Sequence, residues 1–224
     1  MSKKVYLSAD FHFNHGNIIK YCKRPFLSDF DKAKLEQENM WKDGVWIGDG
    51  NASKHRLSDE AINLMDTTII NNVNRMVGEE DELWFLGDFC FAKQHSYYQT
   101  AKRYRDRIVC KHVYLVLGNH DHDSIGDLFE NVYNQTEINV NGQRIVVNHY
   151  AMATWDGSHK NVWQCYGHSH STIETWMDTI MPGRRSTDVG VDNAYRLFGE
   201  FRPFSVENDL QKILGSRPGH RQKS

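Results

Sequence analysis

The sequence predicts an α/β fold, because short apolar runs typical of strands alternate with longer segments of helical period. The apolar runs lie at residues 4–8, 83–86, 113–117, 144–147 and 163–166. Runs that are apolar almost throughout suit strands buried on both faces. The alternation also favours parallel pairing of strands in at least the first half of the chain.

Helical spacing marks two of the segments between these runs, residues 59–77 and 97–108. In the first segment, apolar side chains recur at the intervals of one helix face, and Ser58 is placed to cap the first turn. The pair Asn141-Gly142 between two apolar runs predicts a β-hairpin. An antiparallel part is therefore mixed into the fold.

Two segments lack such patterns. Residues 28–58, which include several glycines together with Trp41 and Trp46, show little period, and we expect an insertion or a lid loop there. Either tryptophan could stack on a base, although core packing is the commoner fate of this residue. The basic stretch 216–224 is expected to be a flexible tail, and residues 1–215 a single domain.

Composition and charge narrow the function classes. The net charge of -2 over 224 residues gives no general electrostatic attraction to nucleic acid or to membranes. The four cysteines have no CxxC spacing, which excludes a zinc ribbon and disfavours a disulfide framework. No apolar stretch is long enough to cross a bilayer or to act as a signal peptide, so we expect a cytoplasmic protein with no membrane partner.

Polar side chains follow each of the five predicted strands at or just beyond its carboxyl end. They are Asp10, His12, Asp88, Asn119, His120, Asp121, His149, His168 and His170. In open α/β sheets, ligands bind outside the carboxyl ends of the strands. Two residues separated by one position in extended backbone point to the same side, so Asp10 can act with His12, and His168 with His170.

The order of these motifs resembles that of the calcineurin-like metallophosphoesterase superfamily, in particular its small bacterial and phage members. The motifs are D-x-H, G-D, G-N-H-D, a single histidine after a strand, and G-H-x-H. Segments 8–26 and 187–192 are similar to those members as well. The resemblance implies a sandwich of two mixed β-sheets flanked by helices, with the active site at the strand ends.

The resemblance also implies a binuclear metal centre. One ion would be held by Asp10, His12 and His170, a second by Asn119, His149 and His168, and Asp88 would bridge both. This mixture of imidazole and oxygen ligands suits two divalent ions, with Mn²⁺ preferred and Fe²⁺, Zn²⁺, Ni²⁺ or Mg²⁺ as alternatives. Such a pair can activate a bridging hydroxide for attack on phosphorus.

Catalytic roles follow from the same resemblance. His120 would protonate the leaving group, and Asp121 would orient its ring and keep it protonated. Gly118 would let the backbone turn tightly out of the strand.

Three further residues are candidates for substrate binding. Arg24 could contact a phosphate, and His15 and Asn17 could lie at the rim of the site. For His15 and Asn17 the alternative is that they cap a nearby helix.

Two departures from the family pattern indicate the substrate class. Protein phosphatases of this superfamily carry an arginine after G-D and end the next block in G-N-H-E. Here the first block ends at Ala92 without an arginine, and the second ends at Asp121. The missing arginine would remove a phosphate clamp used in monoester chemistry, so phosphodiesters are favoured.

A further departure is Ala151, which stands where related small enzymes tend to have a proline. Because proline is not a metal ligand, this change predicts a shifted loop and no lost ligand.

The sequence therefore predicts a metal-dependent phosphoesterase, more specifically a phosphodiesterase acting on a nucleotide or a related small phosphodiester. Two alternatives remain open. One is a nuclease acting on DNA or RNA, whose binding would depend strongly on salt. The other is a non-catalytic metal-binding scaffold, which would be expected to have lost ligands or the general acid. The sequence leaves the oligomeric state open.

Overall fold

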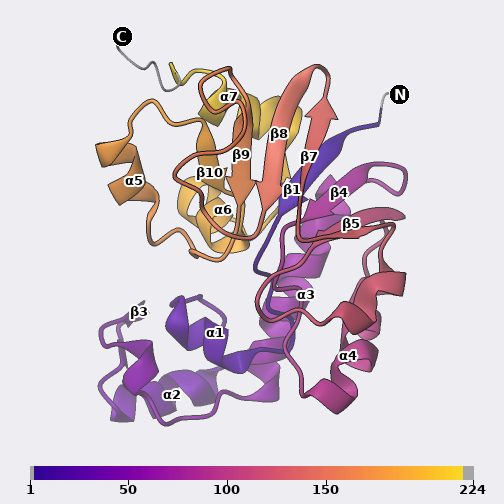
Figure 1. Ribbon diagram of the computed structural model, residues 1–224. Helices are drawn as coiled ribbons and strands as arrows, with labels where there is room; N and C mark the ends of the chain where they lie inside the picture. Colours follow the sequence, from indigo (N-terminus) through magenta and orange to yellow (C-terminus); the bar gives the residue numbers. More distant parts are fainter. Residues whose placement is uncertain (1–2, 219–224) are drawn as a thin grey trace.

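The computed structural model describes residues 3–218, and these form two mixed β-sheets flanked by helices (Figure 1). The strands are β1 (Val5–Ser8), β2 (Trp41–Lys42), β3 (Val45–Trp46), β4 (Glu82–Phe85), β5 (His112–Val116), β6 (Val132–Tyr133), β7 (Gln135–Val140), β8 (Gln143–Asn148), β9 (Trp163–Tyr166), β10 (Ser186–Asp188) and β11 (Phe204–Ser205). The α-helices are α1 (Gly16–Tyr21), α2 (Asp29–Gln37), α3 (Asp59–Met76), α4 (Tyr97–Arg105), α5 (Glu174–Ile180), α6 (Val191–Phe198) and α7 (Gln211–Leu214).

The first sheet has the strand order β11-β1-β4-β5-β6. β1, β4, β5 and β6 are parallel, which confirms the pairing expected for the first half of the chain, and only β11 is antiparallel. Successive side chains of β4 alternate between two cores: Leu83 and Phe85 pack with the helices, and Trp84 packs toward the second sheet. The sheet is thus buried on both faces, as its apolar sequence predicts.

The second sheet has the order β10-β9-β8-β7, and it is mixed because only β7 and β8 are antiparallel. The turn between them has positive φ at Asn141 (51°) and Gly142 (87°), which confirms the predicted hairpin. Leu7 of β1 and Val147 of β8 belong to one core cluster, so the two sheets share a core. The calcineurin-like form of this arrangement stays a prediction.

The predicted helices are present, and the Oγ atom of Ser58 accepts the Ala61 amide, as expected of an N-cap. Residues 28–58 differ from the expected irregular loop, because they contain α2, the β2–β3 hairpin and a short 3₁₀ turn. The sequence signal for α2 is weak, since Leu35 is its one buried apolar side chain. A polar group holds the segment in place: the buried Asp31 carboxylate accepts hydrogen bonds from the hydroxyls of Ser28 and Ser58.

At the end of the described chain, Ser216 and Arg217 form hydrogen bonds with earlier residues. The guanidinium of Arg217 donates to the carbonyls of Arg184 and Ser186, and Ser216 donates to the carbonyl of Lys212. The flexible tail expected at 216–224 stays a prediction, and residues 219–224 lie outside the described part of the chain.

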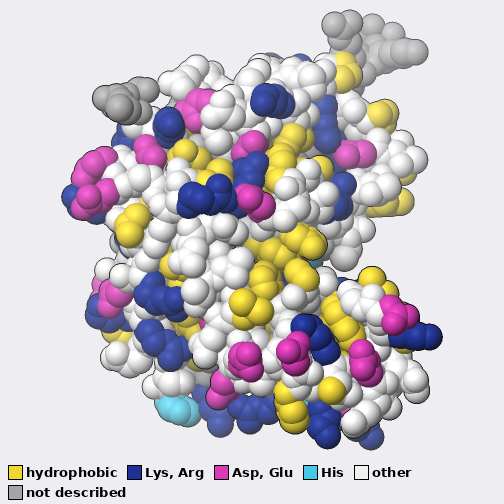
Figure 2. Space-filling model, turned by 180° about the vertical axis from the view of Figure 1, so that it is seen from behind, with side chains coloured by type: hydrophobic (Ala, Val, Ile, Leu, Met, Phe, Trp, Pro, Cys, Tyr) yellow, Lys and Arg dark blue, Asp and Glu magenta, His cyan; other side chains and the backbone are white. Residues whose placement is uncertain are grey.

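The surface carries both signs of charge. Figure 2 shows acidic and basic side chains interspersed over the rear face, with Lys and Arg gathered along the lower edge, the end at which α2 and α4 lie in Figure 1. Within residues 3–218, no helix combines the length and the apolar character that crossing a membrane requires.

Candidate metal centre

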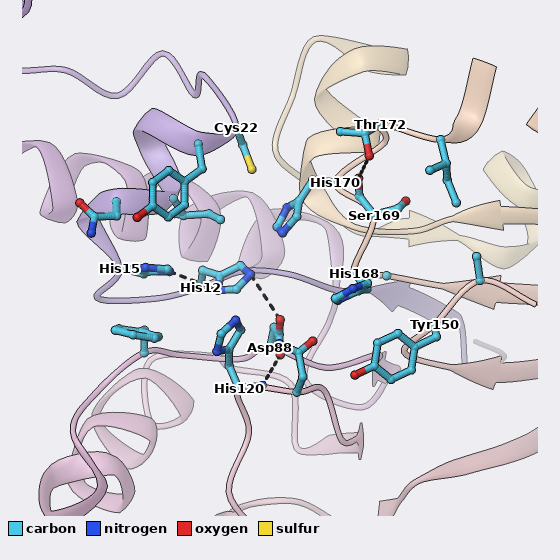
Figure 3. A pocket seen from close by; sticks show the side chains of 18 residues that line it. His12, His15, Cys22, Asp88, His120, Tyr150, His168, Ser169, His170 and Thr172 are labelled. Atoms are coloured by element: carbon cyan, nitrogen blue, oxygen red, sulfur yellow. Dashed lines mark hydrogen bonds and ion pairs between the residues drawn. The ribbon is translucent and has the colours of Figure 1, made fainter. Parts of the chain in front are cut away.

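The carboxyl ends of β1, β4, β5, β8 and β9 bring the predicted polar residues to one place, where the two sheets meet. Figure 3 shows five of these side chains pointing toward a common centre from opposite sides: His12, Asp88, His120, His168 and His170. Asp10 and His12 come from the segment after β1, and Asp88 from the segment after β4. His168 and His170 approach from the segment after β9. Segments far apart in the sequence thus meet as the strand-end argument predicts.

Left-handed backbone is concentrated at this site. The φ angles are 58° at Asp10, 51° at His12, 59° at Asp88, 64° at His168 and 46° at His170. None of these residues is glycine, so each conformation costs free energy that the surrounding structure must offset. Such strain clusters at functional sites because it aims side chains that regular backbone would direct elsewhere.

A first cluster of potential ligands consists of Asp10, His12 and His170, with one ligand atom from each lying within 4.8 Å of the others. The Nε2 atom of His12 is buried and has no hydrogen-bond partner among the described residues. A buried nitrogen without a partner is costly unless something absent from the structure binds it. A cation between these three side chains would supply that partner.

A second cluster consists of Asp88, His149 and His168, again with one ligand atom from each within 4.8 Å of the others. The Oδ1 atom of Asn119 lies 3.1 Å from Nε2 of His149 and so joins this group. The Oδ2 atom of Asp88 is 3.5 Å from Nε2 of His149 and also 3.5 Å from Nε2 of His12. One carboxylate oxygen therefore stands between the two clusters.

The electrostatics of the first cluster fit a bound cation. Burial raises the pKa of Asp10 well above its usual value, and the negative charges of Asp188 and Asp88 add to the effect. Burial lowers the pKa of His12, and the charge of Arg24 adds to the effect, which favours the neutral imidazole that a metal ligand requires. A divalent cation would compensate the carboxylates and accept the lone pair of this imidazole.

Hydrogen bonds fix which nitrogen two of the imidazoles present to the centre. Nδ1 of His149 lies 2.8 Å from the carbonyl oxygen of Leu86, so Nδ1 donates and Nε2 faces the site. Nδ1 of His170 donates in the same way to Oδ2 of Asp192 at 2.7 Å. Partners of this kind orient metal-binding histidines and make them better ligands.

Arg24 supports the orientation of His170 through Asp192. From the sequence it is expected to contact a phosphate, and the structure places it inside the protein instead. It is 1% exposed and donates to both carboxylate oxygens of Asp192, at 2.9 and 2.8 Å. It also donates to the carbonyls of Asp10 and Phe11. Burial alone would raise the pKa of Asp192, but the charge of Arg24 and the bond from His170 lower it. The expectation for Arg24 is thus corrected: its guanidinium is fully engaged inside the protein.

Asp121 also differs from its predicted role. Its carboxylate accepts the backbone amides of Asp88 (2.8 Å), Phe89 (3.0 Å) and Gly118 (2.9 Å) and the hydroxyl of Tyr97 (3.0 Å). It therefore joins the segment after β4 to the segment after β5, and no bond to the His120 ring is found among the described residues. Sequence reasoning missed this because, apart from Gly118, the partners of Asp121 lie 24 to 33 positions earlier in the chain.

Gly118 is required for a reason other than the tight turn that was predicted. A Cβ atom at this position would lie 2.3 Å from Oδ1 of Asp88 and 2.5 Å from its backbone nitrogen. Only a residue without a side chain lets the two segments approach so closely. The approach allows Oδ1 of Asp88 to accept the amide of His120 at 2.9 Å.

A cavity of about 850 Å³ opens over the two clusters. His15 and Asn17 line it, as predicted for rim residues; His15 occupies the N-cap position of α1 but makes no capping hydrogen bond through its side chain. Sequence reasoning missed Phe91 and Tyr150, which also line the cavity, because isolated aromatic residues carry no signal of a site. Trp41 and Trp46 are not among its lining residues and pack against each other, as is common for tryptophan.

A third group of potential ligands, Cys22, His170 and Asp192, lies next to the first cluster. It shares His170 with that cluster, and Asp192 is already bound by Arg24. We therefore treat it as part of the same site. Asp192 lies in a segment whose resemblance to small family members is noted above, although no role followed from that resemblance.

Comparisons with known proteins support the fold. No protein-family model matches the chain. An uncharacterized protein of Methanocaldococcus jannaschii is 27% identical over 190 residues, which cover 85% of this chain and 82% of that protein. The crystal structure of a protein of unknown function from Aquifex aeolicus has a TM-score of 0.61 at 19% identity, over 95% of this chain and all of that one. A phosphoesterase from E. coli has a TM-score of 0.35 at 14% identity, over 75% of this chain and 70% of that one, too low for any inference.

Proposed function

We propose that this protein is a phosphoesterase that uses two divalent metal ions, with Mn²⁺ preferred, and acts on a small phosphodiester. One observation carries the proposal: Oδ2 of Asp88 lies 3.5 Å from Nε2 of His12 and 3.5 Å from Nε2 of His149. A carboxylate shared between two sets of imidazole and oxygen ligands is the arrangement that a pair of ions requires. The seven candidate ligands predicted from the sequence supply both sets.

The first ion would be held by Asp10, His12 and His170, and the second by Asn119, His149 and His168, with Asp88 shared. When bound, such ions act as Lewis acids toward phosphate oxygens and lower the pKa of water that attacks phosphorus. Hydrogen bonds to Leu86 and Asp192 fix two of the imidazoles, which limits reorganisation on binding.

His120 is the proposed general acid. Its side chain is exposed and lines the cavity, with its ring centroid 5.6 Å from that of His12. Its backbone amide donates to Oδ1 of Asp88, which holds the backbone of His120 beside the centre. A proton held on such a ring can be given to the oxygen that leaves phosphorus.

The lining of the cavity favours a diester. None of the described residues that line it is Lys or Arg, so no guanidinium or ammonium group is placed to balance the second negative charge of a monoester. Part of the wall is apolar or aromatic instead, including Ile18, Phe91, Tyr150 and Ile173. Such a wall suits the organic groups on both sides of a phosphodiester.

Hydrolysis of bis-p-nitrophenyl phosphate and of p-nitrophenyl phosphate, with Mn²⁺ or with chelator, tests the proposal. We expect metal-dependent turnover with the diester preferred, and loss of turnover in Asp88→Asn. His120→Ala should lower kcat by about 10²–10⁴-fold. The matched control is His122→Ala, which removes a neighbouring imidazole that does not line the cavity. Equal effects of the two substitutions would contradict the role of His120.

Metal content gives a readout that does not depend on turnover. Elemental analysis of the Mn²⁺-loaded protein should find two ions per chain, and Asp88→Asn should lower that number. Two bound ions without turnover of any phosphoester would favour the non-catalytic scaffold. Cleavage of DNA or RNA in preference to small diesters would favour the nuclease.

A further inference from the structure

Two smaller cavities adjoin the cavity that opens over the two ligand clusters. The 850 Å³ cavity shares His15, Asn17 and Phe91 with a smaller neighbour of about 240 Å³. That neighbour in turn shares Asn14, Arg56 and Phe91 with a third cavity of about 500 Å³. We call this third cavity, lined by Asn14, Arg56, Phe91 and Lys93, the outer trough. Phe91 lines all three cavities and so lies between the proposed metal centre and the outer trough.

The Phe91 ring is a fixed platform. Its backbone amide donates to the carbonyl of Phe13 at 2.8 Å, and its carbonyl accepts from the side chain of Asn14 at 3.0 Å. The His15 ring stacks on it, with centroids 4.1 Å apart and planes 13° apart. Phe91 is nevertheless 41% exposed, which leaves ring surface for a bound aromatic group.

The position of His120 indicates which part of a substrate meets this platform. The rings of His120 and Phe91 are 5.7 Å apart and nearly perpendicular. In the proposed hydrolysis, oxygen from water forms a bond to phosphorus while the bond to the leaving oxygen breaks. His120 gives its proton to that leaving oxygen. The leaving group therefore lies on the Phe91 side of the centre, and its far end points toward the outer trough.

The outer trough differs from the catalytic cavity in charge. Arg56 and Lys93 are both exposed, and within residues 3–218 neither side chain is found in an ion pair. No described residue that lines the trough is acidic. Exposed cations close to an aromatic platform and unopposed by carboxylates suit a base followed by a phosphate.

We propose that the outer trough binds a second phosphate of the substrate, carried by the leaving-group nucleoside. The substrate would then be a short linear nucleotide chain in preference to a cyclic mononucleotide. This inference rests on the proposed phosphoesterase function, because it uses His120 to assign the direction of cleavage. The metal centre cleaves one phosphodiester, Phe91 stacks on the departing nucleoside, and Arg56 and Lys93 hold the phosphate beyond it.

Thymidine dinucleotides test the proposal, because they differ only in the terminal phosphate. The set is the dinucleoside monophosphate TpT, its 5′-phosphorylated form pTpT and its 3′-phosphorylated form TpTp. kcat/KM is measured for each with Mn²⁺, and Kd by calorimetry. We expect one phosphorylated form to exceed TpT by about tenfold in kcat/KM at low salt and to bind more tightly. The excess should shrink with added salt, because exposed charges are screened.

Charge removal assigns the effect to the trough. Arg56→Gln and Lys93→Gln should each reduce the preference for the phosphorylated form by about threefold to fivefold, the scale of an exposed ion pair. Neither should change hydrolysis of bis-p-nitrophenyl phosphate, which has no second phosphate. Lys212→Gln removes an exposed lysine of α7, which lies near the upper end of the molecule in Figure 1, and it should leave the preference unchanged.

The results separate the two proposals. If bis-p-nitrophenyl phosphate is cleaved while all three dinucleotides have equal kcat/KM and equal Kd, the trough proposal is overturned and the phosphoesterase stands. A preference that survives both Arg56→Gln and Lys93→Gln also overturns it. If the wild type cleaves no diester but binds the phosphorylated form more tightly through these two residues, the phosphoesterase proposal fails and the phosphate site stands.

Discussion

Asp192→Asn is expected to weaken both the stability of the protein and its affinity for metal. The Asp192 carboxylate accepts two hydrogen bonds from the buried guanidinium of Arg24 and one from Nδ1 of His170. The substitution keeps the shape of the side chain and removes its charge. It therefore leaves the cation of Arg24 buried without a counterion.

The magnitude follows from burial. The side chain of Arg24 is fully buried and that of Asp192 is 8% exposed, so water screens the pair little. Breaking such a pair by neutralising one partner costs about 3–5 kcal/mol. In a domain of this size, that loss lowers the melting temperature by about 10 °C. Weaker orientation of His170 should also lower Mn²⁺ affinity by about 10–100-fold.

Calorimetric melting of the metal-free protein and Mn²⁺ titration measure the two effects separately. Asp178→Asn is the matched control, since Asp178 pairs with Arg184 and Arg217 but is 42% exposed, and its loss should cost under about 1 kcal/mol. Adding Arg24→Gln to Asp192→Asn should cost less than the sum of the two single substitutions. The reasoning is refuted if Asp192→Asn melts like Asp178→Asn and binds Mn²⁺ like the wild type.

Three other predictions concern metal and protons. Gly118→Ala should abolish tight Mn²⁺ binding, because the added Cβ would lie 2.3 Å from Oδ1 of Asp88. The control is Gly142→Ala, which should bind Mn²⁺ normally and cost only about 1 kcal/mol of stability, because Gly142 has a φ of 87°. Mn²⁺ at about 100 times its Kd should stabilise the wild type by about 2.7 kcal/mol per site in thermal melts, an increase that chelator reverses and that fails to appear if no ion binds. Burial raises the pKa of Asp66 to about 6, so this group favours the folded state below its unfolded pKa, near 4, and that contribution is lost as pH rises through 6. Asp66→Asn should therefore gain up to about 3 kcal/mol relative to the wild type between pH 4 and pH 7 in urea titrations, and a constant difference would contradict this.

The parts of the fold and site that could be predicted follow from local sequence patterns and from the rule that sites form at the carboxyl ends of parallel strands. The strands and the hairpin at Asn141-Gly142 follow from local period and turn chemistry, and the structure confirms them. The convergence of Asp10 and Asp88 follows because the parallel strands β1 and β4 share one carboxyl edge. The ligand role of these residues stays a prediction.

The parts that could not be predicted depend on contacts between distant segments. Arg24 and Asp192 are 168 positions apart, and nothing near either residue distinguishes a buried pair from a surface arginine and a loop carboxylate. Asp121 lies next to His120 in the chain, yet its carboxylate is used by backbone amides about 30 residues earlier. In α2 a single buried leucine leaves no apolar stripe to detect.

Bound at the place where the two sheets meet, the proposed metal ions would also have a mechanical role. Asp10, His12 and Asp88 follow strands of the first sheet, and His149 and His170 follow strands of the second. Each ion would therefore be a cross-link between the two halves of the molecule. Loading the centre with metal should slow amide hydrogen exchange in both sheets together. Loss of one ion should let the two sheets separate transiently, so that exchange becomes faster in both.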